Sequence, residues 1–133
     1  MNVPTHLSHK PIIGVNDYDR IDGQFTPNTD AQALSIGQAQ YDEREISVKV
    51  FRHTGNKWSP QSEELPPHRA LDLTILIITS MLTNPITNSV ISHLNEQIVE
   101  PRRVQEITAY YNANRQVIRS KLEEIRDLLN TLL

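Results

Sequence analysis

The glycines of this chain all lie in its N-terminal half, and this distribution constrains the fold more than any other feature. Residues 1 to about 65 contain all four glycines and most of the apolar and polar alternation with a period of two, which is typical of strands. The remainder has no glycine and shows the longer periodicity of helices. The sequence therefore predicts an α+β fold in which a sheet comes first and helices follow. At 133 residues the chain fits a single domain, with a sheet portion at 1–62 and a helical portion at 63–133.

The first portion predicts an N-terminal three- or four-stranded antiparallel sheet. In one strand Ile46, Val48 and Val50 alternate with Ser47, Lys49 and Phe51, so the two sets face opposite sides of the sheet. The segment 16–30 is rich in Asn, Asp, Gly and Pro and predicts a long loop. The predicted strands cover residues 11–15, 33–41 and 45–53, with a turn at 42–44, a second turn at 53–58 and a short return strand that begins at Trp58.

The second portion predicts two long antiparallel helices. The first begins near Pro66 or Pro67, because proline is tolerated in a first helical turn and excluded from a helix interior, and it ends around Leu82. Residues 83–100 connect the helices and include a short helical piece around 90–98. Pro101 then opens the second helix, at roughly 102 to 131.

Composition and charge exclude several classes of protein. A net charge of −3 gives no uniform basic surface that could hold DNA, although local basic sites remain. The absence of cysteine removes disulfides and thiolate chemistry and fits a reducing compartment. The apolar run at 70–82 is too short to span a membrane and contains Asp72, and the N-terminus lacks the pattern of a secretion signal. We therefore expect a cytoplasmic protein.

Catalytic and cofactor motifs are largely missing. The sequence contains no P-loop, dinucleotide-binding fingerprint, nucleophile elbow or paired-histidine zinc helix. The five histidines never fall four residues apart on one helix, which speaks against a metal site. A nucleotide-cleaving enzyme would need His68 or Glu64 as its general base. We expect no enzymatic activity, no cofactor and no metal.

Arginines of the predicted second helix are the distinctive feature of the sequence. Arg115 occupies one position of an apolar stripe that includes Tyr111, Ile118 and Leu122, and Arg119 lies one helical turn further on. The two guanidinium groups could converge on one phosphate-bearing ligand. The alternative is structural, because Arg119 could instead pair with Glu123 and Arg115 with Asp72.

Arg102 and Arg103 open the same helix, where positive charge opposes the helix dipole. An anion bound at this N-terminus would compensate the charge. Pairing with Glu100 or Glu106 is the alternative.

Three further pairs of residues are candidates. Arg52 and Trp58 could place a guanidinium beside an aromatic ring that stacks on a base, although a single tryptophan is more often part of a core. Tyr110 and Tyr111 carry the same ambiguity. Asn84 and Asn88 could contact a base or a ribose from a lid, and ordinary turn chemistry explains them equally well.

Two resemblances go beyond these patterns. The stretches at 13–23, 33–41 and 47–77 (IGVNDYDRIDG, ALSIGQAQY and SVKVFRHTGNKWSPQSEELPPHRALDLTILI) resemble a family of small bacterial and phage proteins of unknown function. The order of elements in an acidic protein of this size is similar to the phage anti-Thoeris sponge proteins, which capture cyclic ADP-ribose messengers. The second resemblance implies anti-defence activity, with a cyclic ADP-ribose isomer bound without hydrolysis between the subunits of a homo-oligomer. Related sponges also bind cyclic oligonucleotides.

Taken together, these features predict a non-catalytic sponge for a small nucleotide messenger. The expected ligand-binding residues are Arg115, Arg119, Arg52, Trp58, Asn84, Asn88, Tyr111 and Arg102. The alternative is a protein-interaction module, an immunity factor or adaptor, that uses the Leu/Ile face of residues 118–133 to bind a partner helix. In both cases we expect a homo-oligomer assembled through the C-terminal helix, with no DNA and no membrane as partner.

Overall fold

The computed structural model describes residues 1–60, 62–83 and 91–133. The predicted α+β fold is confirmed, because a four-stranded antiparallel sheet precedes three α-helices in these residues. The chain forms two compact units, Met1–Leu71 and Asp72–Leu133, which are described separately. The boundary between them lies inside the first helix, a little beyond the junction at residues 62 and 63 that the sequence suggests.

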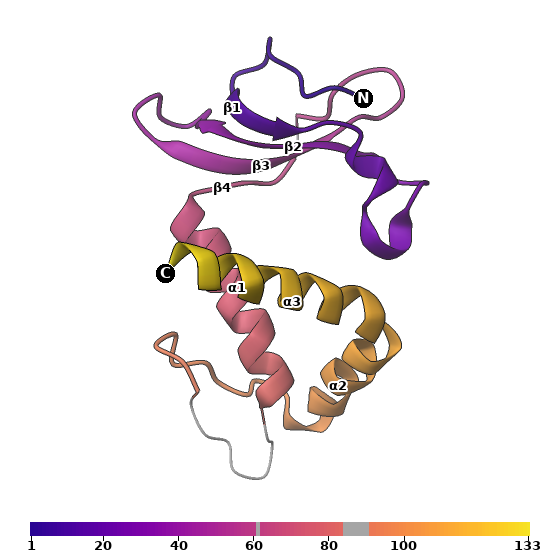
Figure 1. Ribbon diagram of the computed structural model, residues 1–133, viewed down its shortest axis with the longest axis vertical. Coiled ribbons are helices and arrows are strands. Elements are labelled where there is room, and N and C mark those ends of the chain that lie inside the picture. The colour runs from indigo at the N-terminus through magenta and orange to yellow at the C-terminus, as the bar shows by residue number, and fades with distance from the viewer. Residues whose placement is uncertain (61, 84–90) are drawn as a thin grey trace. The chain divides into compact units, whose positions relative to one another are not determined.

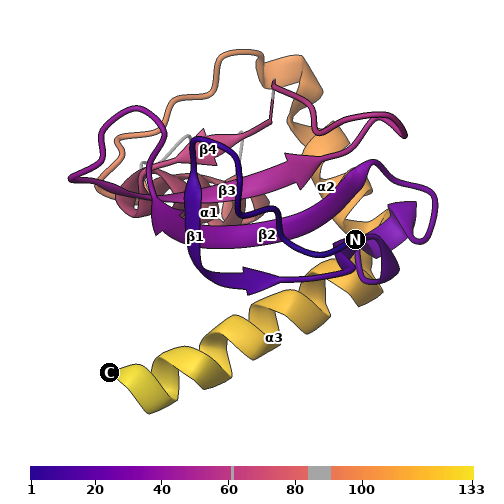
Figure 2. The same cartoon turned by 90° about the horizontal axis from the view of Figure 1, so that it is seen from above.

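The sheet has the strand order β1-β2-β3-β4 (Figures 1 and 2). Each of the three predicted strands is present, with ends that differ by one to three residues. The predicted fourth strand, which begins at Trp58, is wrong. Trp58 forms an isolated bridge with His53, and the strand that pairs with β3 begins at Glu64. The strands are β1 (Lys10–Val15), β2 (Ala31–Gln38), β3 (Ile46–Arg52) and β4 (Glu64–Leu65).

A close backbone approach fixes the pairing of β1 with β2. The register shifts between Pro11 and Ile13, and at this irregularity the backbone of β1 lies directly over Gly37. A Cβ atom on Gly37 would lie 2.1 Å from the carbonyl oxygen of Lys10, a distance that no side chain tolerates. Only glycine fits at position 37, because any side chain would collide with the backbone of Lys10.

The buried face of the sheet is built from small and polar residues. Ala33, Ser35, Gly37, Ser47 and Phe51 are buried on it. The N-terminal segment that precedes β1 lies on one face of the sheet (Figure 1) and contributes His9, which is also buried. Small side chains on β2 allow this segment to approach closely.

The opposite face of the sheet carries the larger aliphatic residues and is only partly covered within this unit. Ile36 is 39% exposed, and Val48 and Val50 are half-buried. A shallow apolar groove of about 350 Å³ runs along this face, between Val15, Leu34 and Leu65. The predicted alternation of β3 is confirmed, and the residues buried within the unit are Ser47, Lys49 and Phe51.

The predicted loop at 16–30 contains two short 3-10 turns, η1 (Tyr18–Arg20) and η2 (Gly23–Phe25). Asp17 precedes the first turn with a φ of 54°, a left-handed conformation that aspartate accepts more readily than most residues. Its backbone N–H donates to the carbonyl of Met1 at 2.9 Å. The loop therefore holds the start of the chain against the sheet unit.

The first helix, α1 (Pro67–Leu82), starts at a proline and ends at Leu82, as the sequence predicts. The predicted helical piece at 90–98 is wrong over residues 91–98, where the chain forms a turn. The Glu96 carboxylate accepts hydrogen bonds from the backbone N–H groups of Ile91 and Ser92 and from the Ser92 hydroxyl. The backbone N–H groups of Ile91 and Ser92 therefore have hydrogen-bond partners without forming a helix. Residue 90 lies outside the described residues.

The predicted single helix at 102–131 is divided. A 3-10 turn, η3 (Pro101–Arg103), leads into α2 (Val104–Ala113), and α3 (Arg115–Leu132) follows. Asn114 separates them with φ −112° and ψ 21°, and its side-chain amide donates to the carbonyl oxygen of Tyr110 at 3.0 Å. Asparagine competes in this way with the helical backbone. Arg115 therefore begins a helix and does not sit inside one.

Candidate functional site

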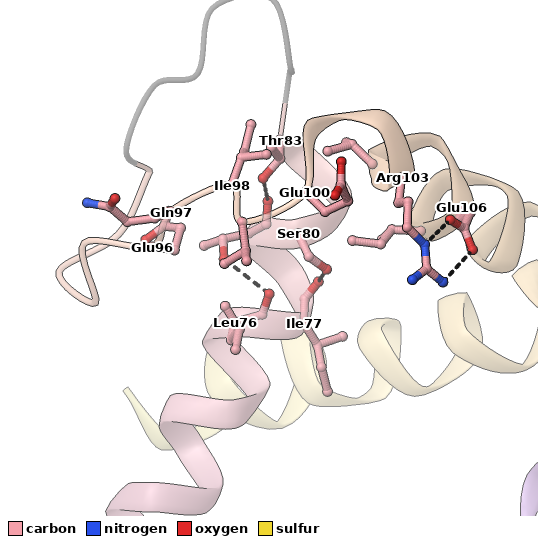
Figure 3. A pocket seen from close by; sticks show the side chains of 14 residues that line it. Leu76, Ile77, Ser80, Thr83, Glu96, Gln97, Ile98, Glu100, Arg103 and Glu106 are labelled. Carbon is pink, nitrogen blue, oxygen red and sulfur yellow. Dashed lines mark hydrogen bonds and ion pairs between the residues drawn. The ribbon is translucent and has the colours of Figure 1, made fainter.

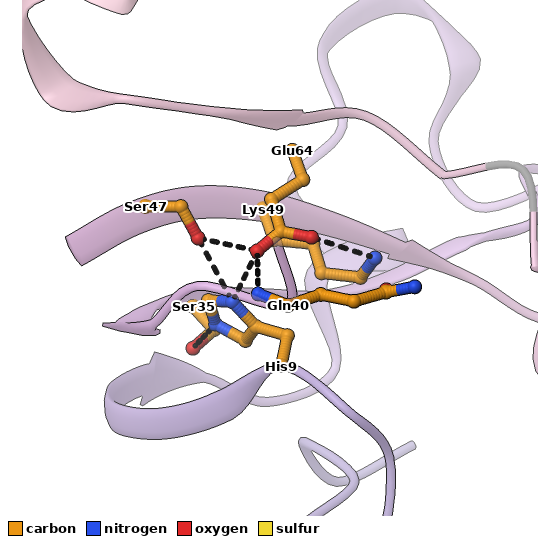
Figure 4. A network of polar contacts seen from close by, with 6 residues as sticks. All are labelled: His9, Ser35, Gln40, Ser47, Lys49 and Glu64. Atoms are coloured by element: carbon orange, nitrogen blue, oxygen red, sulfur yellow. Dashed lines mark hydrogen bonds and ion pairs between the residues drawn. The ribbon is translucent and has the colours of Figure 1, made fainter. Parts of the chain in front are cut away.

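A buried polar network on the sheet holds the first part of the site (Figure 4). His9 is 1% exposed, and both of its ring nitrogens have partners. Nδ1 lies 3.0 Å from Ser47 Oγ and 3.1 Å from a Glu64 carboxylate oxygen, while Nε2 lies 2.9 Å from Ser35 Oγ. The histidine thus connects the N-terminal segment to β2, β3 and β4.

Glu64 is the charged centre of this network. Its Oε1 accepts from Ser47 Oγ at 2.6 Å and from the backbone N–H of Gln40 at 2.7 Å, and Lys49 Nζ lies 3.9 Å from Oε2. Burial opposes ionisation of this group, but the hydrogen bonds from Ser47, Gln40 and His9 and the charge of Lys49 together hold the pKa of the Glu64 carboxyl below its ordinary value. The carboxylate is therefore ionised at neutral pH.

Ser35, His9 and Glu64 follow one another in the order of a hydrolase triad, in which a base orients and activates a nucleophile. The two serines of the network do not meet the further requirement of access. Ser35 is 6% exposed and Ser47 is fully buried, which leaves a substrate no open approach to either hydroxyl oxygen. The geometry supports a role in holding four segments of the chain together.

Sequence reasoning did not single out this network. His9, Ser35, Ser47 and Lys49 form no recognisable motif, and the sequence suggests Glu64 as a candidate general base without indicating these partners. One signal was present, because Ser47 and Lys49 alternate with valines on β3. Polar residues on one face of a strand are ordinarily assigned to solvent, so the alternation alone could not reveal burial.

Arg52 is neutralised within the sheet unit. Its guanidinium donates to Asp30 at 2.6 Å and to the Glu63 carboxylate at 2.8 and 3.2 Å. The hydrogen bonds to Glu63 and Asp30 raise the pKa of Arg52, and the Arg52 guanidinium lowers the pKa of Glu63. Its hydrogen-bonding groups are directed at these carboxylates.

Trp58 packs against other rings. Its ring meets Phe51 edge-on at a centroid distance of 5.7 Å and His53 at 5.0 Å. These ring contacts agree with the alternative prediction that Trp58 packs in a core and does not stack on a base.

The arginines of the helical unit mostly have carboxylate partners. Arg119 donates to Glu123 at 2.8 Å, and this hydrogen bond raises the pKa of Arg119. Arg102 lies 3.9 Å from Glu100, and Arg103 is bound to Glu106 at 2.6 Å. All of these side chains are exposed, so the pairs contribute little to stability.

Arg115 is the exception among the arginines named as ligand-binding. It is exposed at the first position of α3, and within the described residues no carboxylate forms a salt bridge with it. Asp72, its suggested partner, instead lies 3.5 Å from His93. Tyr111 is half-buried, and Asn84 and Asn88 lie outside the described residues. The ligand-binding role of these residues stays a prediction.

The helical unit also contains a groove of about 570 Å³ between the second half of α1 and residues 96–107 (Figure 3). Most of its exposed wall is apolar, and several of its polar side chains have partners within the chain. The hydroxyls of Thr79, Ser80 and Thr83 donate to carbonyls of α1, and Arg103 is bound to Glu106. The groove therefore suits apolar groups better than phosphates.

Two absences hold for the residues that the structure describes. None of their helices is long and apolar enough to cross a membrane, and none of their His, Asp and Glu side chains gather into a group of three that could hold a metal ion.

The fold and the network define a small α+β protein with a polar, internally bonded sheet unit and an amphipathic C-terminal helix. Residues 1–86 match the model of DUF6530, a family of unknown function, and the chain belongs to this family. The match covers the sheet unit and α1 and ends before α2 and α3. No curated protein and no solved structure matches the chain.

Proposed function

We propose that the protein is a non-catalytic interaction module that binds a partner helix through the apolar stripe of α3. This stripe consists of Ile118, Leu122, Ile125, Leu129 and Leu132. Its spacing of four and three residues is that of a coiled-coil seam. The observation that carries the proposal is its exposure, which reaches 38% at Ile125, 44% at Leu129 and 79% at Leu132.

The polar side of α3 supports this function. Arg119 pairs with Glu123 and Arg126 with Asp127 on the helix itself, so these charges are satisfied without a ligand. Leu128 lies beside the stripe and is 63% exposed. Contiguous apolar surface of this kind, bordered by charged residues, is typical of a protein interface.

The test compares Leu129→Asp and Leu132→Asp with Ser120→Asp, a change on an exposed position away from the stripe. The unsubstituted protein and each variant are expressed in the source organism, crosslinked mildly and purified. Captured proteins are identified by mass spectrometry. The complex is then reconstituted from purified components, and its affinity is measured for each variant. We expect both stripe variants to weaken the rebuilt complex at least about tenfold, since burying an unpaired charge costs more than 1.4 kcal/mol, while Ser120→Asp binds normally. Equal capture by all variants would refute the proposal.

Arg115 favours a second candidate function, the sequestration of a nucleotide messenger. Arg115 is exposed at the first position of α3, and no side chain caps this helix N-terminus. A helix N-terminus of this kind suits an anion. Arg119 lies one turn away, and its exposed pair with Glu123 is weak enough for a diphosphate to replace. The ligand would be a cyclic ADP-ribose isomer or a cyclic oligonucleotide, and either function would operate in the cytoplasm.

Isothermal titration distinguishes this candidate from the first. Sequestration requires a measurable heat with one of these nucleotides, lost in Arg115→Glu and retained in Leu132→Asp. Zero heat with every nucleotide, from protein whose circular dichroism spectrum is that of a folded chain, would exclude it.

A further inference from the structure

We infer that Asn114 is a hinge at which α2 and α3 close into one continuous helix, residues 104–132, when a partner covers the stripe of α3. The inference rests on the proposed interaction function and adds a conformational step to it. Three features carry it: the geometry of the break between the helices, the apolar pattern that continues across the break, and the unequal exposure of the stripe.

The break between α2 and α3 is confined to one residue, at the corner where the two helices meet (Figure 1). The backbone N–H of Asn114 donates to the Tyr110 carbonyl at 3.0 Å, and the Asn114 carbonyl accepts from the Ile118 N–H at 3.1 Å. Both bonds join residues four apart, as in a regular helix. With φ −112° and ψ 21°, Asn114 departs from helical geometry by about 50° and about 60°. Rotation at this one residue therefore converts the bent form into a straight helix.

The bent form separates backbone groups that a continuous helix would pair. The N–H groups of residues 115–117 lie in the first turn of α3, and the carbonyl groups of residues 111–113 lie in the last turn of α2. Straightening would join them as three helical hydrogen bonds. Within the described residues no side chain caps α3, and the Asn114 side-chain amide instead donates to the Tyr110 carbonyl at 3.0 Å. This local bond favours the bend and competes with the three backbone bonds.

The apolar pattern continues across the break. Steps of three or four residues lead from Ile118 through position 115 to Tyr111 and Ile107 of α2, the spacing of one helix face. In the bent form α2 and α3 point in different directions, so these positions do not lie along one line. Straightening aligns them and extends the stripe by Tyr111, which is half-buried, and by Ile107, which is 40% exposed.

The exposure of the stripe connects the hinge to partner binding. Leu129 and Leu132 are exposed, whereas Ile118 and Leu122, which lie nearer to the hinge, are half-buried. A partner that covers the whole stripe must reach these two residues, and rotation at Asn114 supplies the movement that frees them. Such a partner binds the straight form better than the bent form, and this difference in affinity shifts the equilibrium between them.

Distances between two spin labels test the hinge without any partner. The chain contains no cysteine, so Gln105→Cys on α2 and Glu124→Cys on α3, both at exposed positions, place one label on each helix. In a straight helix these positions lie about 28 Å apart along the axis, and the bent form gives a shorter distance. We expect mainly the short distance with Asn114 in place. Asn114→Ala should raise the ratio of long to short distances at least about tenfold, because alanine removes the side-chain bond and favours a helix.

Asn112→Ala is the matched control, because Asn112 is exposed inside α2 and the same substitution there does not touch the break. It should leave the distances unchanged, and Asn114→Gly, which disfavours a helix, should keep the short distance. Equal distances in Asn114→Ala and Asn112→Ala would overturn the hinge. A long distance with Asn114 in place would overturn it as well, since no bend would then remain to close.

The reconstituted complex tests the coupling to binding. Asn114→Ala should bind the captured partner several-fold more tightly than Asn112→Ala, because its hinge is already straight, and Asn114→Gly should bind more weakly. Equal affinities would overturn the coupling. If Leu129→Asp and Leu132→Asp capture the same proteins as the unsubstituted chain, the interaction function fails, and the spin-label distances alone decide whether the hinge exists.

Discussion

At the scale of single residues, His9 contributes most to the sheet unit. It joins Ser35, Ser47 and Glu64, which lie 26, 38 and 55 residues away in the sequence, and its ring meets Phe51 at 5.7 Å. Replacing it leaves several buried polar groups without a partner. We expect His9→Ala to lower the free energy of unfolding by about 2 to 4 kcal/mol.

Urea denaturation measures this change, with His6→Ala as the matched control. His6 is exposed, so its removal should alter the free energy of unfolding by less than about 0.5 kcal/mol. Equal stability of the two variants would contradict the structural role of His9.

The lowered pKa of Glu64 determines how the free energy of unfolding should depend on pH. Its pKa in the folded chain lies below the ordinary value of 4.5, so the unfolded chain takes up the proton first as pH falls. The stabilisation is fully present above pH 4.5 and is lost as pH falls through the lower, folded-state pKa. We expect Glu64→Gln to flatten the acid side of the stability curve measured by urea denaturation from pH 6 to pH 3.

Glu43→Gln is the control for this prediction, because Glu43 is exposed in the turn between β2 and β3. Its acid profile should follow that of the unsubstituted protein. An unchanged slope in Glu64→Gln would show that the buried carboxylate is not the group that titrates.

At the scale of elements, the close contact between β1 and β2 depends on Gly37. A methyl group there meets the backbone of Lys10, which cannot move aside as a flexible side chain can. We expect Gly37→Ala to lower the free energy of unfolding by more than about 2 kcal/mol, measured by thermal or urea denaturation. Gly55→Ala is the comparison, because Gly55 has a φ of +100° and open space around it, so its cost should be only about 1 kcal/mol of backbone strain.

The helices show where a regular pattern and a local interaction disagree. Periodicity continues from Tyr111 to Ile118 and predicts one helix, but Asn114 interrupts it through a hydrogen bond to Tyr110. Pro67, by contrast, acts within its own turn and begins α1 as predicted. The start of α1 follows from the proline itself, whereas the break at residue 114 depends on whether the Asn114 side chain bonds to the backbone, which periodicity does not record.

At the scale of the whole molecule, a net charge of −3 conceals the separation of charge along α3, whose acids all lie in residues 122–132 and most of whose cations lie in residues 115–121. This separation distinguishes the two candidate functions. Raising ionic strength from about 10 mM to about 150 mM shortens the Debye length from about 30 Å to about 8 Å, so a nucleotide held at Arg115 should bind several-fold more weakly, whereas a partner helix held by the apolar stripe should bind with nearly the same affinity. Isothermal titration at the two ionic strengths measures the difference, and nucleotide binding that does not change with salt would contradict a role of Arg115 in holding phosphate.

The sequence by itself determined the α+β class, the positions of three strands, the start of α1 and the apolar stripe of α3, because each depends on residues two to four places apart. Only the tertiary structure decided which face of β3 is buried, that His9 meets Glu64, and that Arg52 is held by Asp30 and Glu63. Those partners are far apart along the chain, and whether they meet depends on how the strands and loops of the sheet unit come together, which no local periodicity records.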